Sequence, residues 1–144
     1  MNKIEVRKGR IEDIPKIKEL AERERSSLGF LTKAVYKRAI EDEQIFVVLI
    51  DERVAGFQLY YHRKKDTQTT LYQKTVDKNF RHQGLARLLV DAVVQEAQEI
   101  GHKTILLKCP IDNESNEFHK KIGFVLARQE QGKKRKLNIW VMNI

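Results

Sequence analysis

The sequence predicts a mixed α/β domain, and three patterns lead to that class. Short β-branched or alternating runs, of which Ile45–Ile50 is the clearest, indicate strands. A continuous apolar stripe at helical spacing through Gly84–Ile100 indicates a long amphipathic helix. The strand-like and helix-like segments are interleaved along the chain, in the order β-α-α-β-β-β-α-β-α-β-β. With 144 residues, 41% of them hydrophobic, the chain suits a single domain over 1–144.

The first third of the chain predicts one strand and two helices. Residues 4–7 alternate between apolar and charged side chains, as a half-buried strand does. Asp13 is a candidate N-cap, and Pro15 suits the first turn of a helix that continues to about Arg25. A second helix is expected over about Thr32–Asp42, where the apolar residues recur at helical spacing.

The middle of the chain predicts a three-stranded antiparallel segment. The strand Ile45–Ile50 is followed by a short polar turn and then by the strand Val54–Tyr61, which makes a hairpin. A second polar turn precedes a strand at about Thr69–Val76.

Beyond the long helix, which Gly101 is placed to end, the sequence predicts three strands and one helix. A strand Thr104–Cys109 ends at Pro110, and a short helix follows at about Ser115–Lys121. The last two strands are expected at Gly123–Arg128 and Leu137–Ile144, around the basic turn Gly132–Lys136.

Charge and cysteine content narrow the classes of protein to consider. The formal net charge is +8, and residues 60–144 carry +7 of it, which favours an anionic partner for the second half. The single cysteine, Cys109, excludes an internal disulfide and a multi-cysteine zinc site, and no metal is expected. No apolar run approaches the roughly 20 residues of a membrane span, so a cytoplasmic protein is the expectation.

The segment from Val76 to Ala86 carries most of the functional information. A β-branched strand stops there, and a basic loop enters the long helix through Gly84. Such a junction points unpaired N–H groups outward and adds the positive end of the helix dipole, which suits a phosphate group. Lys78, Arg81, His82 and Arg87 add positive charge. On this evidence alone, a glycine that merely begins a helix with a solvated basic face is an equal alternative.

Two motifs resemble the GCN5-related N-acetyltransferase (GNAT) family. Arg81-x-x-Gly84-x-Ala86 is similar to the R/Q-x-x-G-x-G/A signature, with alanine as the second small residue. Asn116-x-Phe118-His119 followed by Gly123-Phe124 is similar to the family's second conserved segment. The resemblance implies the GNAT acyl-CoA N-acyltransferase fold, a mostly antiparallel central sheet of about six to seven strands with about four helices. It also implies acetyl-CoA as cofactor.

The resemblance implies a cofactor site on named residues. Backbone groups of the strand before the loop are expected to bind pantetheine, and the loop amides the pyrophosphate. Asn116, with Asn113 second, is expected to contact the pantetheine arm. The residues so assigned are Lys74, Thr75, Val76, Arg81, His82, Gln83, Gly84, Leu85, Ala86, Arg87, Asn113, Asn116 and His119.

His119 stands where the family commonly has a tyrosine that protonates the leaving coenzyme A thiolate. An unperturbed imidazole, with a pKa of about 6.5, can protonate a thiolate whose acid has a pKa of about 8.5. We therefore expect His119 to act as that acid, with simple packing beside the cofactor as the alternative.

The implied reaction is direct attack of an amine on the thioester, in which a backbone N–H at Val76 polarises the carbonyl. A lysine-like amine is only about 0.04% neutral at pH 7, a penalty near 4.6 kcal/mol, so a general base or a desolvating pocket is expected to offset part of it. Neither Thr70–Val76 nor Thr104–Cys109 contains a carboxylate. The candidate bases are a water chain or one of four side chains: Tyr60, Tyr61, His62 and Asp66.

The expected acceptor is a primary amine of a small molecule or peptide, bound by Ser26–Thr32 and Gln129–Arg135. The basic turn favours a neutral or anionic-tailed amine. Two other classes stay open at this point: an acetyl-CoA sensor without turnover, and a basic nucleic-acid-binding module, which the lack of interleaved aromatic residues disfavours. Trp140 and its neighbours suit either a homodimer contact or the core.

Overall fold

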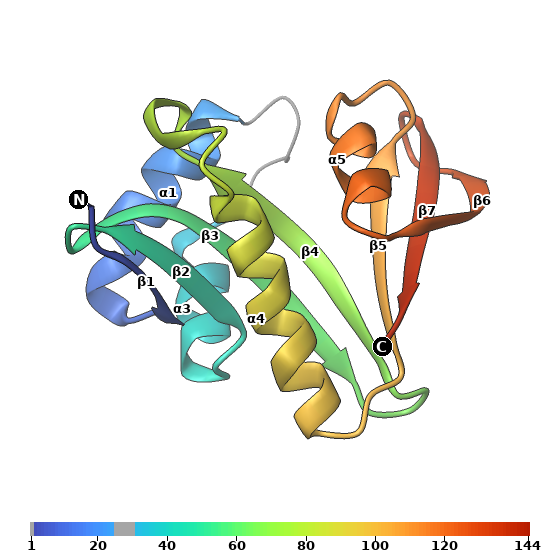
Figure 1. Cartoon of the computed structure of the whole chain (residues 1–144), viewed down its shortest axis with the longest axis horizontal. Helices are drawn as coiled ribbons and strands as arrows, with labels where there is room; N and C mark the ends of the chain where they lie inside the picture. Colours follow the sequence, from blue (N-terminus) through green and yellow to red (C-terminus); the bar gives the residue numbers. More distant parts are fainter. Residues whose placement is uncertain (1, 25–30) are drawn as a thin grey trace. The chain divides into compact units, whose positions relative to one another are not determined.

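The computed structural model describes residues 2–24 and 31–144, so Ser26–Phe30 of the expected acceptor loop lies outside the described residues. Seven strands form one sheet in the order β1-β2-β3-β4-β5-β7-β6 (Figure 1). The strands are β1 Ile4–Lys8, β2 Ile45–Ile50, β3 Arg53–Arg63, β4 Gln68–Val76, β5 Thr104–Pro110, β6 Val125–Gln131 and β7 Lys136–Asn143. The helices are α1 Ile14–Arg23, α3 Lys33–Glu41, α4 Leu85–Glu99 and α5 Ser115–Lys121, with 3₁₀ turns η1 Ile11–Asp13 and η2 Lys78–Phe80.

The predicted element order and the mostly antiparallel character of the sheet are confirmed. The pairs β1–β2, β2–β3, β5–β7 and β6–β7 are antiparallel, and β4–β5 is parallel. The β4–β5 register runs from Gln68–Thr104 to Leu71–Leu107, whereas β4 itself continues to Val76. The last residues of β4 therefore extend beyond the ladder that joins it to β5.

The chain divides into two compact units, and β3, β4 and α4 each contribute to both. The first unit comprises Met1–Tyr60 and Gln73–Val93, and the second comprises Tyr61–Tyr72 and Val94–Ile144.

None of the helices in the described part of the chain has the length and apolarity that a membrane span requires.

The core of the first unit lies on both faces of its strands (Figure 1). The start of α4 packs on one face, where Leu85 and Leu89 join a buried cluster with Val48, Ile50 and Ala55. On α1 and α3 the buried residues recur at helical spacing, as the sequence predicts. They are Ile14, Ile17, Leu20, Ala21, Tyr36, Ala39 and Ile40.

The start of α1 differs from the expectation that Asp13 caps it. The Asp13 carboxylate makes no capping bond to α1. It accepts instead from Arg10 N at 2.8 Å, which closes the 3₁₀ turn before the helix, and from Arg7 Nη1 at 2.7 Å. This hydrogen bond raises the pKa of Arg7 above its ordinary value. Asp13 is thus a buried link between β1 and the helix entry.

The last strands also differ in position from the prediction. Gly123 has φ +114°, and Phe124 N donates to His119 O at 3.0 Å, so both residues belong to the end of α5. The strand begins only at Val125, because Phe124 still bonds the end of α5 and its side chain is buried. On β7, Ile139 and Trp140 are buried, which favours the core interpretation of this segment over a dimer contact.

A chain of hydrogen bonds crosses the interior of the second unit. Glu96 Oε1 lies 2.8 Å from His62 Nε2, and His62 Nδ1 lies 2.7 Å from Thr69 Oγ1. Thr69 Oγ1 is in turn 3.0 Å from His102 Nδ1. One consistent proton arrangement has His102 donating to Thr69, Thr69 to His62 and His62 to Glu96. The fully buried Thr69 hydroxyl therefore joins two imidazoles.

Replacing this hydroxyl tests how much the chain contributes to stability. We expect Thr69→Val to lower the free energy of unfolding by about 1–3 kcal/mol, because two buried imidazole nitrogens lose their shared partner. Urea denaturation measures this change. Thr70→Val, at the neighbouring half-buried position on β4, is the matched control. Equal stability of the two variants would contradict the expectation.

Candidate phosphate-binding loop and active-site residues

The loop between β4 and α4 turns the chain from strand to helix in eight residues, 77–84. Two of them have left-handed backbone conformations, His82 with φ +65° and Gly84 with φ +78°. A Cβ added at Gly84 would meet no heavy atom within 4 Å. The backbone at Gly84 is therefore open to an approaching group, while its φ suits glycine.

The first N–H groups of α4 lie next to this opening. Within residues 2–24 and 31–144, no acceptor is found for the N–H groups of Leu85, Ala86 and Arg87, whereas Leu88 N donates to Gly84 O at 3.1 Å. Free donors at a helix start carry the positive end of the helix dipole. The loop thus presents fixed backbone donors, as the sequence predicts for an anion site.

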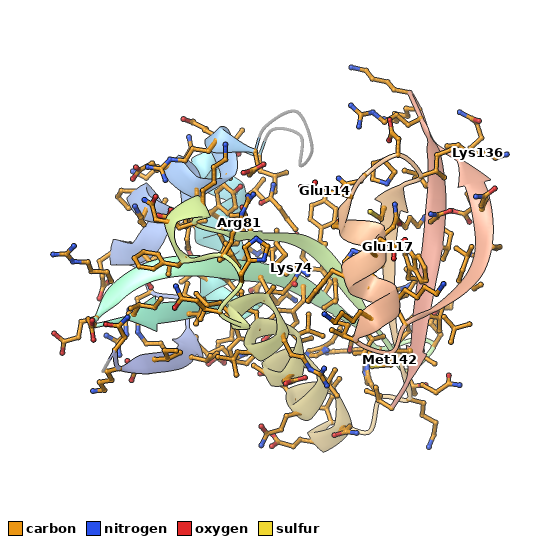
Figure 2. All side chains as sticks on the ribbon, turned by 45° about the horizontal axis from the view of Figure 1, so that its top comes forward. Lys74, Arg81, Glu114, Glu117, Lys136 and Met142 are labelled. Carbon is orange, nitrogen blue, oxygen red and sulfur yellow. The ribbon has the colours of Figure 1, made fainter. Side chains whose placement is uncertain are left out.

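The apolar side chains of the loop are buried or partly buried, and most of its polar side chains face solvent. Leu85 is buried in the apolar cluster that the half-buried Phe80 also contacts, and these two residues anchor the loop. The polar side chains are exposed (Figure 2 labels Arg81). The exposed positions are Lys78, Arg81, His82, Gln83 and Arg87. A ligand at the loop therefore meets backbone donors and mobile positive charge.

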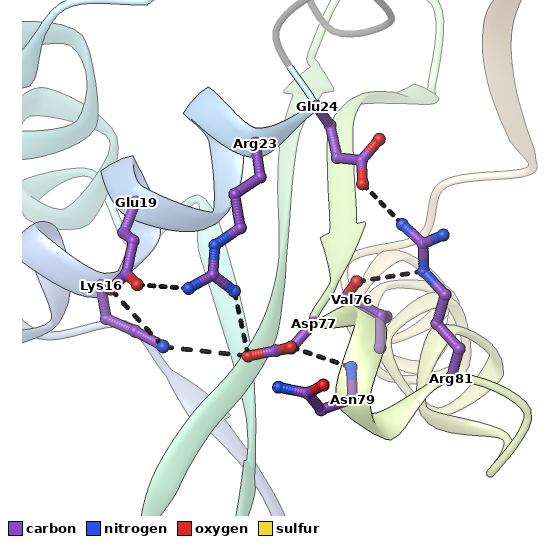
Figure 3. Close-up of polar contacts among 8 residues, drawn as sticks. All are labelled: Lys16, Glu19, Arg23, Glu24, Val76, Asp77, Asn79 and Arg81. Carbon is purple, nitrogen blue, oxygen red and sulfur yellow. Dashed lines mark hydrogen bonds and ion pairs between the residues drawn. The ribbon is translucent and has the colours of Figure 1, made fainter.

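Asp77 fixes the start of the loop, and the sequence analysis did not identify it. Its carboxylate is buried and accepts from Asn79 N at 3.0 Å, while its own N–H donates to Ala55 O at 2.7 Å. Arg23 and Lys16 on α1 pair with it at 3.5 and 3.8 Å, and both cations also pair with Glu19 (Figure 3). An aspartate at the end of a strand is a local signal for an Asx turn, in which its carboxylate accepts from the N–H two residues on. No local pattern in the sequence indicates the partners on α1.

The end of β4 holds the residues expected to bind pantetheine. Thr75 is buried, and Lys74 and Val76 are partly buried (Figure 2 labels Lys74). The Thr75 carbonyl lies 2.8 Å from the position of a Cβ on Gly56, so only glycine on β3 permits this close approach.

His119 lies on α5 in the second unit, with an exposed fraction of 6%. Its ring is surrounded by aromatic neighbours, with centroid distances of 5.7 Å to Phe118, 6.0 Å to Phe124 and 6.4 Å to Trp140. Aromatic residues of α5, of the segment after it and of β7 thus surround the imidazole.

Asn116 and Asn113 have internal partners in the second unit. Asn116 Nδ2 donates to Pro110 O at 2.9 Å and to Asn113 O at 2.8 Å, and its Oδ1 accepts from Trp140 Nε1 at 2.8 Å. Asn113 Oδ1 accepts from Ser115 N at 2.9 Å, which starts α5. A cofactor contact through the Asn116 side chain requires it to share or exchange one of these bonds.

The four candidate bases differ in their surroundings. Tyr60 is fully buried, and its hydroxyl lies 2.6 Å from Lys8 Nζ. Asp66 pairs with Arg63 at 3.4 Å within the β3–β4 turn, and His62 belongs to the buried chain with Glu96. Burial, and then Tyr72, raises the pKa of Tyr61, which lowers its phenolate fraction at neutral pH.

Comparison with known proteins gives matches of two kinds. Residues 14–124 match the model of a family described as "Acetyltransferase (GNAT) family". A search of curated proteins finds no significant match.

Several solved structures have a similar fold. Ard1 from Thermoplasma volcanium has a TM-score of 0.86 at 21% identity, with 98% of this chain and 97% of that chain covered. The ribosomal-protein-S18-alanine N-acetyltransferase from Escherichia coli has 0.81 at 19%, covering 100% and 94%. N-acetylglutamate synthase from Neisseria gonorrhoeae, complexed with coenzyme A and N-acetyl-glutamate, has 0.85 at 16%, covering 98% and 35%.

The family match spans most of the chain and includes the loop at Gly84, and the strand order and helix placement agree with the fold that the resemblance implies. Membership also defines the activity class, acetyl-CoA-dependent N-acetylation, and hence the cofactor. The chain therefore belongs to the acetyltransferase (GNAT) family.

Proposed function

We propose that this protein transfers the acetyl group of acetyl-CoA to an α-amino group, with the cofactor's pyrophosphate held by the loop 81–87. The observation that carries the proposal is the open backbone at Gly84 beside the free N–H groups of Leu85, Ala86 and Arg87. These donors fit a diphosphate, since they are fixed and positive. Apart from the two chain neighbours of Gly84, no heavy atom of the described residues lies within 4 Å of a Cβ placed there.

The remaining cofactor residues follow the family pattern. Lys74, Thr75 and Val76 supply backbone groups for the pantetheine arm, and the N–H of Val76 polarises the thioester carbonyl as negative charge develops on its oxygen. In the second unit Asn116 and Asn113 hold the loop before α5, and the resemblance assigns Asn116, with Asn113 second, to the cofactor. The amine attacks the carbonyl directly, so no covalent enzyme intermediate forms.

We assign His119 as the acid that protonates the leaving thiolate. Its support is chemical and positional: an imidazolium can donate this proton, and aromatic neighbours hold the ring. In the family motif the position commonly carries tyrosine, another donor.

Neither β4 nor β5 contains a carboxylate that could act as a base, which favours an acceptor amine of low pKa. An α-amine with a pKa near 7.85 is about 12% neutral at pH 7, which costs about 1.2 kcal/mol. The corresponding cost for a lysine amine is near 4.6 kcal/mol. Without a dedicated base, the α-amine therefore reacts more readily.

The turn before β7 supports a neutral or anionic acceptor. Lys133, Lys134, Arg135 and Lys136 are all exposed there (Figure 2 labels Lys136). Their combined field disfavours a cationic peptide and favours one that carries a carboxylate.

Introducing negative charge at the loop tests the cofactor site. We expect Gly84→Glu to weaken coenzyme A binding by at least about 100-fold, because like charges in contact cost several kcal/mol. Isothermal titration calorimetry measures the dissociation constant. Gly101→Glu is the matched control, since Gly101 has φ +83° and an equally open Cβ position. Equal affinity of the two variants would refute the site.

Substitution of His119 tests its role as an acid. We expect His119→Phe to retain coenzyme A binding and to lower kcat by about 100-fold, because proton donation to the leaving group is lost. His119→Tyr restores a donor and is expected to recover most of kcat. Steady-state kinetics and calorimetry separate the two effects. If the Phe and Tyr variants have the same kcat, His119 is not the acid.

A panel of amines tests the acceptor. The two substrates to compare are a peptide with a free α-amine and an N-terminally blocked peptide with a lysine side chain. If only the neutral fraction of the amine differs, kcat/KM for the α-amine is expected to be about 300-fold higher at pH 7. At pH 9 the ratio falls to about 25-fold, because the α-amine is then almost fully neutral. A peptide with an acidic second residue is expected to have a lower KM than the same peptide with lysine at that position. A higher kcat/KM for the lysine side chain at pH 7 would refute the α-amine assignment.

A further inference from the structure

The C-terminal end of α1 contacts the β4–α4 loop through two separate ion pairs (Figure 3). The first joins Arg23 to the buried Asp77, with Lys16 as a second cation. Because Asp77 also accepts from Asn79 N, this pair ties the helix end to the first turn of the loop. Its effect is to hold the loop in place.

The second ion pair involves the arginine of the cofactor motif. Arg81 Nη2 lies 2.7 Å from Glu24 Oε1, and Arg81 Nε donates to Val76 O at 3.5 Å. The exposed fractions of the two side chains are 38% and 24%, so the pair is accessible to solvent. The guanidinium is thus bonded to a carboxylate beside the free backbone donors.

We propose that Glu24 competes with the cofactor's pyrophosphate for Arg81 and thereby sets the affinity of the protein for acetyl-CoA. The inference rests on the pyrophosphate site proposed above. A guanidinium bonds carboxylate and phosphate oxygens through the same planar set of donors, so the two anions are alternative partners. Glu24 also places a negative charge next to the loop, and this charge repels the diphosphate.

The geometry lets this exchange occur without releasing the helix. Arg23 and Lys16 keep their own ion pairs with Asp77 when Arg81 changes partner, so α1 stays attached to the loop. A partly exposed ion pair contributes little net free energy, which keeps the exchange inexpensive. The expected effect of Glu24 on cofactor affinity is therefore about two- to fivefold.

Removing the Glu24 charge tests the proposal. We expect Glu24→Gln to lower the dissociation constant for coenzyme A by about two- to fivefold at low salt, with less effect at high salt. The KM for acetyl-CoA falls by a similar factor, while the KM for the amine does not change. Glu22→Gln, which removes the same charge from an exposed position on α1, is the matched control. Thermal denaturation verifies that both variants are folded.

A double-mutant cycle identifies Arg81 as the group for which Glu24 competes. Arg81→Gln alone is expected to weaken coenzyme A binding, and in that background Glu24→Gln has no more effect than Glu22→Gln. The proposal is overturned if Glu24→Gln binds coenzyme A no more tightly than Glu22→Gln, or if its effect persists without Arg81.

The two failures can be told apart. If Gly84→Glu and Arg81→Gln both bind coenzyme A as the unmodified protein does, the pyrophosphate site itself is wrong. If both variants weaken binding and Glu24→Gln does not tighten it, the site stands and only the competition by Glu24 is wrong.

Discussion

The candidate site depends on unpaired backbone donors at the start of α4. The first N–H groups of a helix have no helical acceptor, because the acceptor of each would lie four residues back in the preceding loop. The left-handed conformations of His82 and Gly84 orient the turn, and burial of Leu85 fixes where the helix begins. The phosphate affinity proposed for this loop thus rests on backbone geometry, and the basic side chains add to it.

Charge around the loop is balanced rather than uniformly positive. A buried carboxylate, Asp77, shapes the turn and pairs with two cations of α1 that also pair with Glu19. Glu24, the residue after that helix, pairs with the motif arginine. The same helix end therefore stabilises the loop through one ion pair and tempers its attraction for anions through the other. Net charge alone, which is +8, does not describe this local arrangement.

Much of the fold follows from local patterns. Ile45–Ile50 is a strand and 85–99 is helical because each pattern buries an apolar surface in only one backbone conformation. Two expectations fail where a specific hydrogen bond replaces the expected local pattern. Asp13 bonds Arg7 on β1 instead of capping α1, and Phe124 N bonds His119 O at the end of α5 before β6 begins. The Asn116 side chain bonds Trp140 and Pro110, and its contact with the cofactor stays a prediction.

The sequence by itself determined the element order and the family, and it predicted the phosphate loop, since each depends on residues close together in the chain. A glycine at the strand–helix junction and an apolar stripe at helical spacing are local signals, and backbone geometry converts them directly into structure. Only the tertiary structure decided which charges face one another. Glu24 and Arg81 are 57 positions apart, and Arg23 and Asp77 are 54 apart. Pairing over such distances arises from the packing of α1 beside the loop, which no spacing in the sequence encodes.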